Sequence, residues 1–204
     1  PALSKVTNTI NKLVNVTKTN TKLKLINNEN LNSWHFNSNI NPALMVGGEG
    51  VAADLIILLK FSENFETPDF DIATAKPVIL DDNSKRPLVG IIELNPEINL
   101  SKENSDLYLE TILLHEITHI LGFHSDLFQH FAGGLSQTIK DGSEQRTNEN
   151  KQFIITPKVV NFAKKYFNCD SLEGVELESQ GNLPGSHWEA TILLGEYMNS
   201  DLYS

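Results

Sequence analysis

The feature that most constrains this chain is an H-E-x-x-H pattern inside the apolar stretch 113–123. An α-helix advances about 3.6 residues per turn, so residues four apart lie on one face. His115 and His119 can therefore direct two imidazoles at one metal ion, and Glu116 can reach a water bound to that ion. Two nitrogen ligands with an adjacent carboxylate form the arrangement of a zinc hydrolase.

The pattern is short, and it also occurs by chance in helices that bind nothing. The surrounding sequence favours a metal-binding role for the pattern. The segment is apolar on almost every side, so it is expected inside a core. Two histidines and a glutamate buried there without partners would cost several kcal/mol. Gly122 is the expected end of the helix, through a left-handed backbone conformation.

Composition limits the number of domains and the kinds of partner that this chain can have. The 204 residues suit one or two small domains, and the net charge of −10 argues against a nucleic-acid partner. No apolar run is long enough to span a bilayer, so any membrane attachment is expected through segments outside this sequence. The chain begins at Pro1 without a visible signal peptide, which suggests a trimmed segment. The single cysteine, Cys169, cannot form an internal disulfide.

Patterning before the H-E-x-x-H helix predicts an α+β fold. Residues 2–16 have the apolar spacing of an amphipathic helix packed on a sheet, and the run 54–61 predicts a strand buried on both faces. Residues 72–80 predict an edge strand, because Pro77 cannot donate to a ladder, and 87–96 predict a central strand. The edge strand could align an extended peptide, although any sheet has edges.

Other segments carry weaker signals. Short extended pieces are expected at 23–26 and around Trp34. Residues 124–152 show no clear period and predict a long loop, and loops are also expected from Cys169 to Gly185. Between them, Thr156 and the proline that follows predict a helix start.

A catalytic zinc usually takes three protein ligands and leaves the fourth position to water. The candidates for the third ligand are His124, His130, Glu144 and His187. In the compact metzincin pattern the third histidine would fall at Ser125, and His124 is one position short.

The remaining candidates differ in their neighbours. His130 lies among phenylalanines and is interpreted as a packing residue. Glu144 would suit a gluzincin-type site, but its glycine, serine and glutamine neighbours do not resemble the helix that presents such a glutamate. We favour His187, which follows Gly185 and precedes a Trp-Glu pair.

Taken together, these segments resemble the leishmanolysin family, a group of surface zinc metalloproteases within the metzincins. The likeness lies in the H-E-x-x-H-x-x-G-F run, the long insertion after it, the G-S-H-W-E segment at 185–189, and Met198 placed eleven positions after His187. Segments 50–54, 87–96 and 156–160 are also similar to family segments. The resemblance covers about residues 10 to 200.

The resemblance implies a zinc ion held by His115, His119 and His187, with Glu116 as the catalytic acid and base. Met198 would form the hydrophobic floor of a Met-turn without being a ligand. It also implies a metzincin-type α+β fold with a mixed twisted sheet. One catalytic domain is expected, with a subdomain at 1–123 that ends in the active-site helix and a smaller C-terminal subdomain at 124–204.

The expected activity is therefore that of a monomeric zinc metalloendopeptidase acting on proteins and peptides. The resemblance implies an extracellular or cell-surface location and a role in surface proteolysis or cell adhesion. Two alternatives stay open: a non-catalytic adhesion module that kept the fold, and a gluzincin-like peptidase that uses Glu144. Leishmanolysins are usually rich in cysteine, and this chain departs from that pattern.

Overall fold

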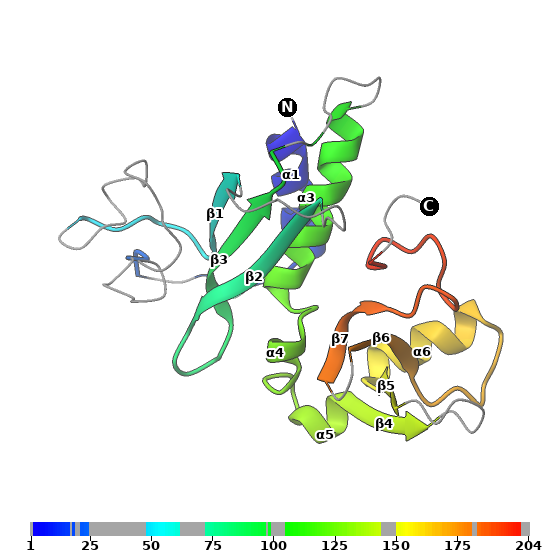
Figure 1. Cartoon of the computed structure of the whole chain (residues 1–204). Coiled ribbons are helices and arrows are strands. Elements are labelled where there is room, and N and C mark those ends of the chain that lie inside the picture. The colour runs from blue at the N-terminus through cyan, green and yellow to red at the C-terminus, as the bar shows by residue number, and fades with distance from the viewer. Residues whose placement is uncertain are drawn as a thin grey trace. The chain divides into compact units, whose positions relative to one another are not determined.

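The computed structural model describes residues 2–16, 18, 21–24, 48–61, 72–96, 98, 105–143, 150–180 and 183–200 (Figure 1). The chain divides into two units, Pro1–Leu121 and Gly122–Ser204. Helices and strands occur in both, which is the expected mixture of an α+β protein.

The first unit contains a three-stranded sheet in the order β1-β3-β2. The strands are β1 (Ile56–Phe61), β2 (Ala73–Leu80) and β3 (Pro87–Leu94), with β1 parallel and β2 antiparallel to β3. The predicted central strand is confirmed, and its side chains at Val89, Ile91, Ile92 and Leu94 are buried. The predicted edge strand is confirmed as well, and Pro77 stands where the register of β2 shifts.

The predicted burial of residues 54–61 on both faces is wrong. Among the described strands β1 stands at an edge, and the side chains of Leu59 and Phe61 are 43% and 63% exposed. An apolar run in the sequence predicts a strand, but the burial of that strand depends on distant segments that cover each of its faces.

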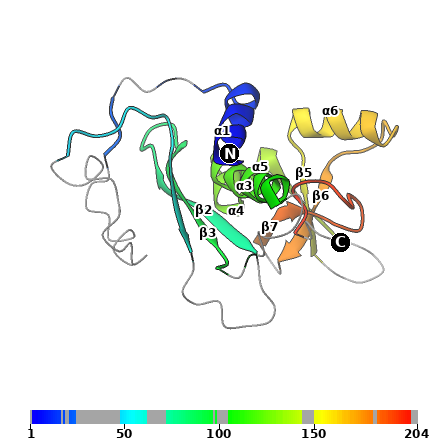
Figure 2. The same cartoon turned by 90° about the horizontal axis from the view of Figure 1, so that it is seen from above.

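Two helices, α1 (Ala2–Leu13) and α3 (Ser105–Leu121), lie on the same face of this sheet (Figures 1 and 2). Both were predicted. Their apolar side chains and those of β3 form one buried cluster of Val6, Ile92, Leu94, Ile112, Leu113, Ile117 and Ile120. Lys5 of α1 also donates to Glu110 of α3 over 2.6 Å.

Gly90 allows α3 to approach β3 closely. A Cβ atom at this position would lie 2.4 Å from Cγ2 of Ile120, well inside van der Waals contact. Glycine is therefore required where the helix crosses the central strand, one residue from His119.

Gly122 follows the last helical residue, as predicted, but the predicted mechanism is wrong. Gly122 is not among the glycines with a positive φ angle. The chain instead turns tightly, with the amide of His124 donating to the carbonyl of Gly122 over 2.8 Å.

The second unit contains a four-stranded antiparallel sheet in the order β4-β5-β6-β7. Its elements are α4 (Ser125–Phe128), α5 (Leu135–Thr138), β4 (Ile139–Ser143), β5 (Asn150–Ile154), α6 (Pro157–Tyr166), β6 (Val175–Gln180) and β7 (Leu183–Trp188). The loop prediction for 124–152 is therefore wrong, and the prediction from Cys169 to Gly185 holds for 169–174 but fails where β6 and β7 form. Short strands rich in polar residues give little periodic signal, and pairing with distant strands stabilises them.

The helix predicted after Thr156 is confirmed as α6, with proline at its first turn. Thr156 occupies the N-cap position, but its side chain makes no capping hydrogen bond. α6 packs on the sheet through Ala163, which is buried with Val175 and Leu193.

The segments expected to be extended near the N-terminus are described only in part. Leu23 forms an isolated bridge with Val51, while Leu25, Ile26, Trp34 and Phe36 lie outside the described residues. Within the described part of the chain, no helix combines the length and hydropathy needed to cross a lipid bilayer.

Candidate metal centre

α3 brings the first two predicted ligands together. His115 and His119 are one turn apart, and their Nε2 atoms lie 3.0 Å from each other. The two ring planes stand at 83°, and both side chains are buried. Two nitrogens held at about 2.0–2.1 Å from one tetrahedral zinc ion would be about 3.3 Å apart. The separation of the two nitrogens is thus close to the one expected for a pair that shares a zinc ion.

Glu116 lies beside His115 on the same helix and is only 4% exposed. Its neighbours Ile117 and Ile120 belong to the main core cluster, so the helix cannot rotate without disrupting that core. The hydroxyl of Thr118, on the same helix, donates to the carbonyl of Leu114 over 2.8 Å, so the Thr118 side chain lies against the preceding turn. Glu116 is therefore a buried carboxyl residue on a helix that the core holds in place, one position from His115.

His187, the predicted third ligand, belongs to β7 of the second unit, where the pairing with β6 is irregular. Leu177 pairs with Trp188 and Ser179 pairs with Pro184, so three residues of β7 face Glu178 alone. A Cβ atom on Gly185 would lie 2.0 Å from the carbonyl oxygen of Glu178, so this bulge requires glycine. Bulges redirect side chains next to functional sites, and this one carries His187.

The residues on either side of His187 are anchored within the second unit. The Ser186 hydroxyl accepts a hydrogen bond of 3.1 Å from the amide of Ser125, at the start of α4. The Trp188 amide donates to the carbonyl of Met198 over 3.0 Å. Met198 itself is 2% exposed, and the buried Asn199 donates its side-chain amide to the carbonyl of Leu193 over 2.5 Å. The backbone that carries His187 is thus held from both sides.

The carboxylate of Glu178 lies near the imidazole of His187. Its Nδ1 lies 3.4 Å from Oε2 of Glu178, and the other oxygen of that carboxylate accepts a 2.7 Å hydrogen bond from Ser200. Neither Glu178 nor Ser200 was singled out from the sequence. The alternation of apolar and acidic residues at 175–178 is a strand signal, and it could have placed Glu178 on the polar face of a strand.

The other candidates for the third ligand have different positions. His124 is the N-cap of α4, and its Nδ1 accepts a 3.2 Å hydrogen bond from the amide of Asp126. His130 is exposed, so its interpretation as a packing residue is wrong. Glu144 lies outside the described residues.

Comparison with models of protein families identifies the family of this chain. The model of the leishmanolysin peptidase family matches residues 11–204, which is nearly the whole chain.

The chain belongs to the leishmanolysin family.

Individual family members give the same result. A leishmanolysin-like peptidase of Caenorhabditis elegans is 31% identical over 149 residues, covering 55% of this chain and 22% of the relative. A ciliated left-right organizer metallopeptidase of Xenopus laevis is 31% identical over 130 residues, covering 58% of this chain and 18% of the relative. The leishmanolysin of Leishmania amazonensis is 33% identical over 107 residues, covering 51% of this chain and 17% of the relative. The chain spans about a fifth of the length of these relatives.

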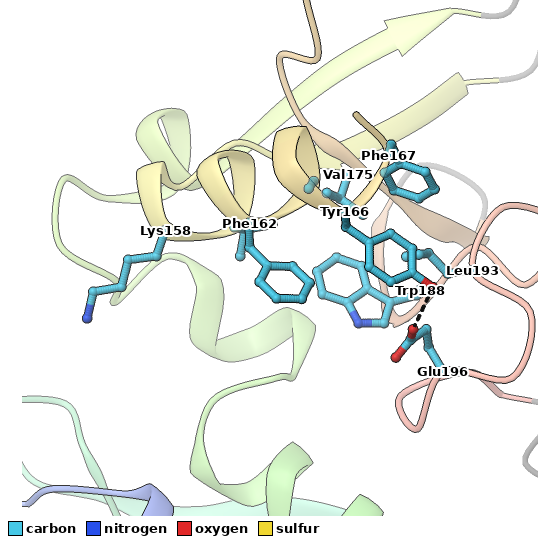
Figure 3. Close-up of a pocket in the computed structure, with 10 residues that line it drawn as sticks. Lys158, Phe162, Tyr166, Phe167, Val175, Trp188, Leu193 and Glu196 are labelled. Atoms are coloured by element: carbon cyan, nitrogen blue, oxygen red, sulfur yellow. Dashed lines mark hydrogen bonds between the residues drawn. The ribbon is translucent and has the colours of Figure 1, made fainter. Parts of the chain in front are cut away.

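This leishmanolysin-family chain also has an apolar pocket of about 250 Å³ within the second unit (Figure 3). Its lining includes Phe162 and Tyr166 of α6 together with Trp188 of β7, and the Tyr166 hydroxyl donates to Glu196 over 3.2 Å. Trp188 follows His187 directly, and successive side chains of a strand point to opposite faces. The pocket is thus on the face of β7 opposite His187.

Proposed function

We propose that this chain is the catalytic part of a zinc metalloendopeptidase. The observation that carries the proposal is the buried pair of His115 and His119, with nitrogens 3.0 Å apart and Glu116 beside them, in a member of the leishmanolysin family. A buried imidazole pair with this separation fits a zinc ion, and a carboxylate next to it fits proton transfer during hydrolysis.

The proposed donor set is His115, His119 and His187. Three imidazoles leave one tetrahedral position for a water molecule, which is the composition of a catalytic zinc site. His187 comes from a glycine-dependent bulge whose backbone is anchored on both sides, so its ring can be offered in a defined direction. Met198 would supply an apolar floor and no ligand bond, because thioether sulfur is a weak donor toward zinc.

A zinc ion held by His115, His119 and His187 would lower the pKa of a water molecule toward about 7 and would polarise the scissile carbonyl. Glu116 accepts the proton of the attacking water, since its carboxylate is held one residue from His115. The water oxygen would bond to the carbonyl carbon, the peptide C–N bond would break, and the same carboxyl group would deliver its proton to the nitrogen of the leaving amine. Glu116 is thereby returned to its ionised form for the next cycle.

Peptide substrates could be aligned by β2, which is an edge among the described strands. Its outer N–H and C=O groups would pair with an extended peptide as an additional strand. An extracellular or cell-surface location, proteolysis at that surface and a contribution to cell adhesion follow from the family as further parts of the proposal. We expect the catalytic unit to act as a monomer without a nucleic-acid partner.

The test combines metal analysis with cleavage of a denatured protein such as casein. We expect about one zinc ion per chain, cleavage that a chelator abolishes, and recovery of cleavage when zinc is restored. Bound zinc without any cleavage would instead indicate a non-catalytic binding module. A chain that binds no zinc would overturn the proposal.

A further inference from the structure

We infer that Glu178 is a positioning residue for His187, holding the imidazole in the tautomer and orientation that present Nε2 to the metal. This inference rests on the proposed function, since it concerns the third ligand of the proposed zinc site. Histidines that bind zinc usually donate their other ring N–H to a carboxylate or carbonyl, which fixes the tautomer and raises ligand basicity.

The two oxygens of Glu178 have separate partners. Oε2 lies 3.4 Å from Nδ1 of His187, and Oε1 accepts the 2.7 Å hydrogen bond from Ser200. The Ser200 contact limits rotation of the carboxylate, which keeps Oε2 at ion-pair distance from Nδ1. A carboxylate facing Nδ1 stabilises the proton on that nitrogen, which leaves the lone pair on Nε2 for a metal ion.

A comparison along β6 shows that this contact is selective. Glu176 and Glu178 share one face of the strand, but Glu176 is buried and forms a 2.7 Å ion pair with Lys151 of β5. Glu178 is 33% exposed in its side chain and faces His187 and Ser200 instead. The strand therefore places one carboxylate in a structural ion pair and the next one against the imidazole.

The bulge accounts for the meeting of Glu178 and His187. Regular pairing would place a single residue of β7 across from Glu178, whereas the bulge places three there. Because Gly185 has no Cβ, the backbone of β7 can press against the carbonyl of Glu178, and His187 reaches the same carboxylate two residues later. Ser200 comes from the segment after Met198, so that segment also supports the ring through Glu178.

The experiment measures zinc affinity in the intact protein by competition with a chromophoric chelator. Glu178→Leu removes both acceptor oxygens at similar size, and Glu178→Gln retains one carbonyl oxygen that can accept the Nδ1 proton. We expect Glu178→Leu to weaken zinc binding about 10- to 100-fold, the range typical of lost outer-shell partners. Glu178→Gln should recover much of that loss, and Ser200→Ala should have a smaller effect than Glu178→Leu.

A matched control is Glu173→Leu, because Glu173 is an exposed carboxylate of the same unit that pairs with Lys140. It should leave zinc affinity within about twofold of the unmodified protein. The visible absorption of the Co²⁺-substituted protein gives a second measure, and Glu178→Leu should change it while Glu173→Leu should not. Circular dichroism of the metal-free variants separates loss of ligand positioning from loss of folding.

An affinity of Glu178→Leu equal to that of the control would overturn the inference while leaving the proposed zinc site intact. Equal losses in Glu178→Leu and Glu178→Gln would also overturn it, since only the negative charge would then matter. If the unmodified protein binds no zinc, the proposed function itself fails, so the two failures are distinguishable.

Discussion

The chemistry proposed for this chain depends on side chains whose separation is set by a single helix. His115 and His119 are one turn apart, and their nitrogens lie close enough to share an ion. Glu116 is buried next to them, where low polarity strengthens any interaction with a developing charge. At this scale the ligands and the proton carrier have separable roles, and substitution can distinguish them.

Replacing Glu116 by glutamine should remove the proton carrier while preserving the metal ligands. We expect zinc content to stay unchanged and peptide cleavage to fall by about 10²- to 10⁴-fold, the usual contribution of general acid–base catalysis. Glu110→Gln, on the same helix, serves as the control and should remain active. Full cleavage activity in Glu116→Gln would assign the proton transfer to another group.

Alanine substitution of His187 should affect zinc affinity, whereas alanine substitution of His124 should affect only the free energy of unfolding. His187→Ala should lower zinc affinity strongly, because one of the three proposed ligands is lost. His124→Ala should leave zinc affinity intact but reduce the free energy of unfolding by about 0.5–2 kcal/mol, because His124 caps α4. Equal zinc binding in the two variants would place the third ligand elsewhere.

The secondary-structure elements hold these side chains through close backbone approaches. Gly90 lets α3 lie against β3, and Gly185 lets β7 lie against β6. Both glycines occupy positions where a Cβ atom would overlap a neighbouring atom. The site thus depends on the packing of elements as well as on the residues that would touch the metal.

The substitution Gly90→Ala tests the helix position. The new methyl group would overlap Ile120, and overpacking of this kind typically costs about 1–3 kcal/mol of unfolding free energy. Adding Ile120→Ala should cost less in this background than in the unmodified protein, because the overlap is relieved. Urea unfolding of the four proteins in a double-mutant cycle gives the coupling, and strict additivity would show that the two groups do not meet.

The turn between β2 and β3 should make stability depend on pH. Asp81 accepts hydrogen bonds from the amide and the hydroxyl of Ser84, both at 2.7 Å, and these bonds hold the pKa of Asp81 below its usual value of 3.8. A carboxyl group whose pKa is lowered by folding stabilises the native state above its unfolded pKa. That contribution is lost as the pH falls through the folded pKa.

The measurement compares Asp81→Asn with the unmodified protein. The unmodified protein should have the higher urea midpoint at pH 5–7, and the difference should shrink as the pH falls from about 4 toward and below the folded pKa of Asp81. A difference that stays constant across this range would mean that the charge of Asp81 contributes nothing.

At the scale of the whole molecule, the proposed donor set combines His115 and His119 with His187, which is distant from them in the sequence. Zinc should therefore bind the folded protein in preference to the unfolded chain and stabilise it. With free zinc at about 100 times the dissociation constant, the gain is about 2.7 kcal/mol, which corresponds to about 5–10 °C in melting temperature.

Scanning calorimetry with and without chelator measures this shift. Glu116→Gln should keep the shift, because it keeps the ligands, and His187→Ala should lose most of it. An unaltered melting temperature after complete removal of zinc from the unmodified protein would contradict the proposed zinc site.

Some features of this protein are local consequences of the order of its residues. The spacing of His115 and His119 places them on one helical face because the period of an α-helix does not depend on the rest of the fold. The central strand before α3 and the helix after Thr156 also follow from continuous apolar runs and terminal signals. These parts of the fold were predictable, and so was the placement of His115 and His119 on one face of α3.

Other features depend on segments that are distant in the sequence. The exposed face of β1, the strands between Ile139 and Trp188 and the capping role of His124 all escaped prediction. Pairing between strands supplies most of the stability of short polar strands. The sequence of one strand does not identify the strand with which it will pair. The meeting of Glu178 with His187 arises in the same way, because a bulge in the folded sheet brings together two side chains whose own sequences give no sign of each other.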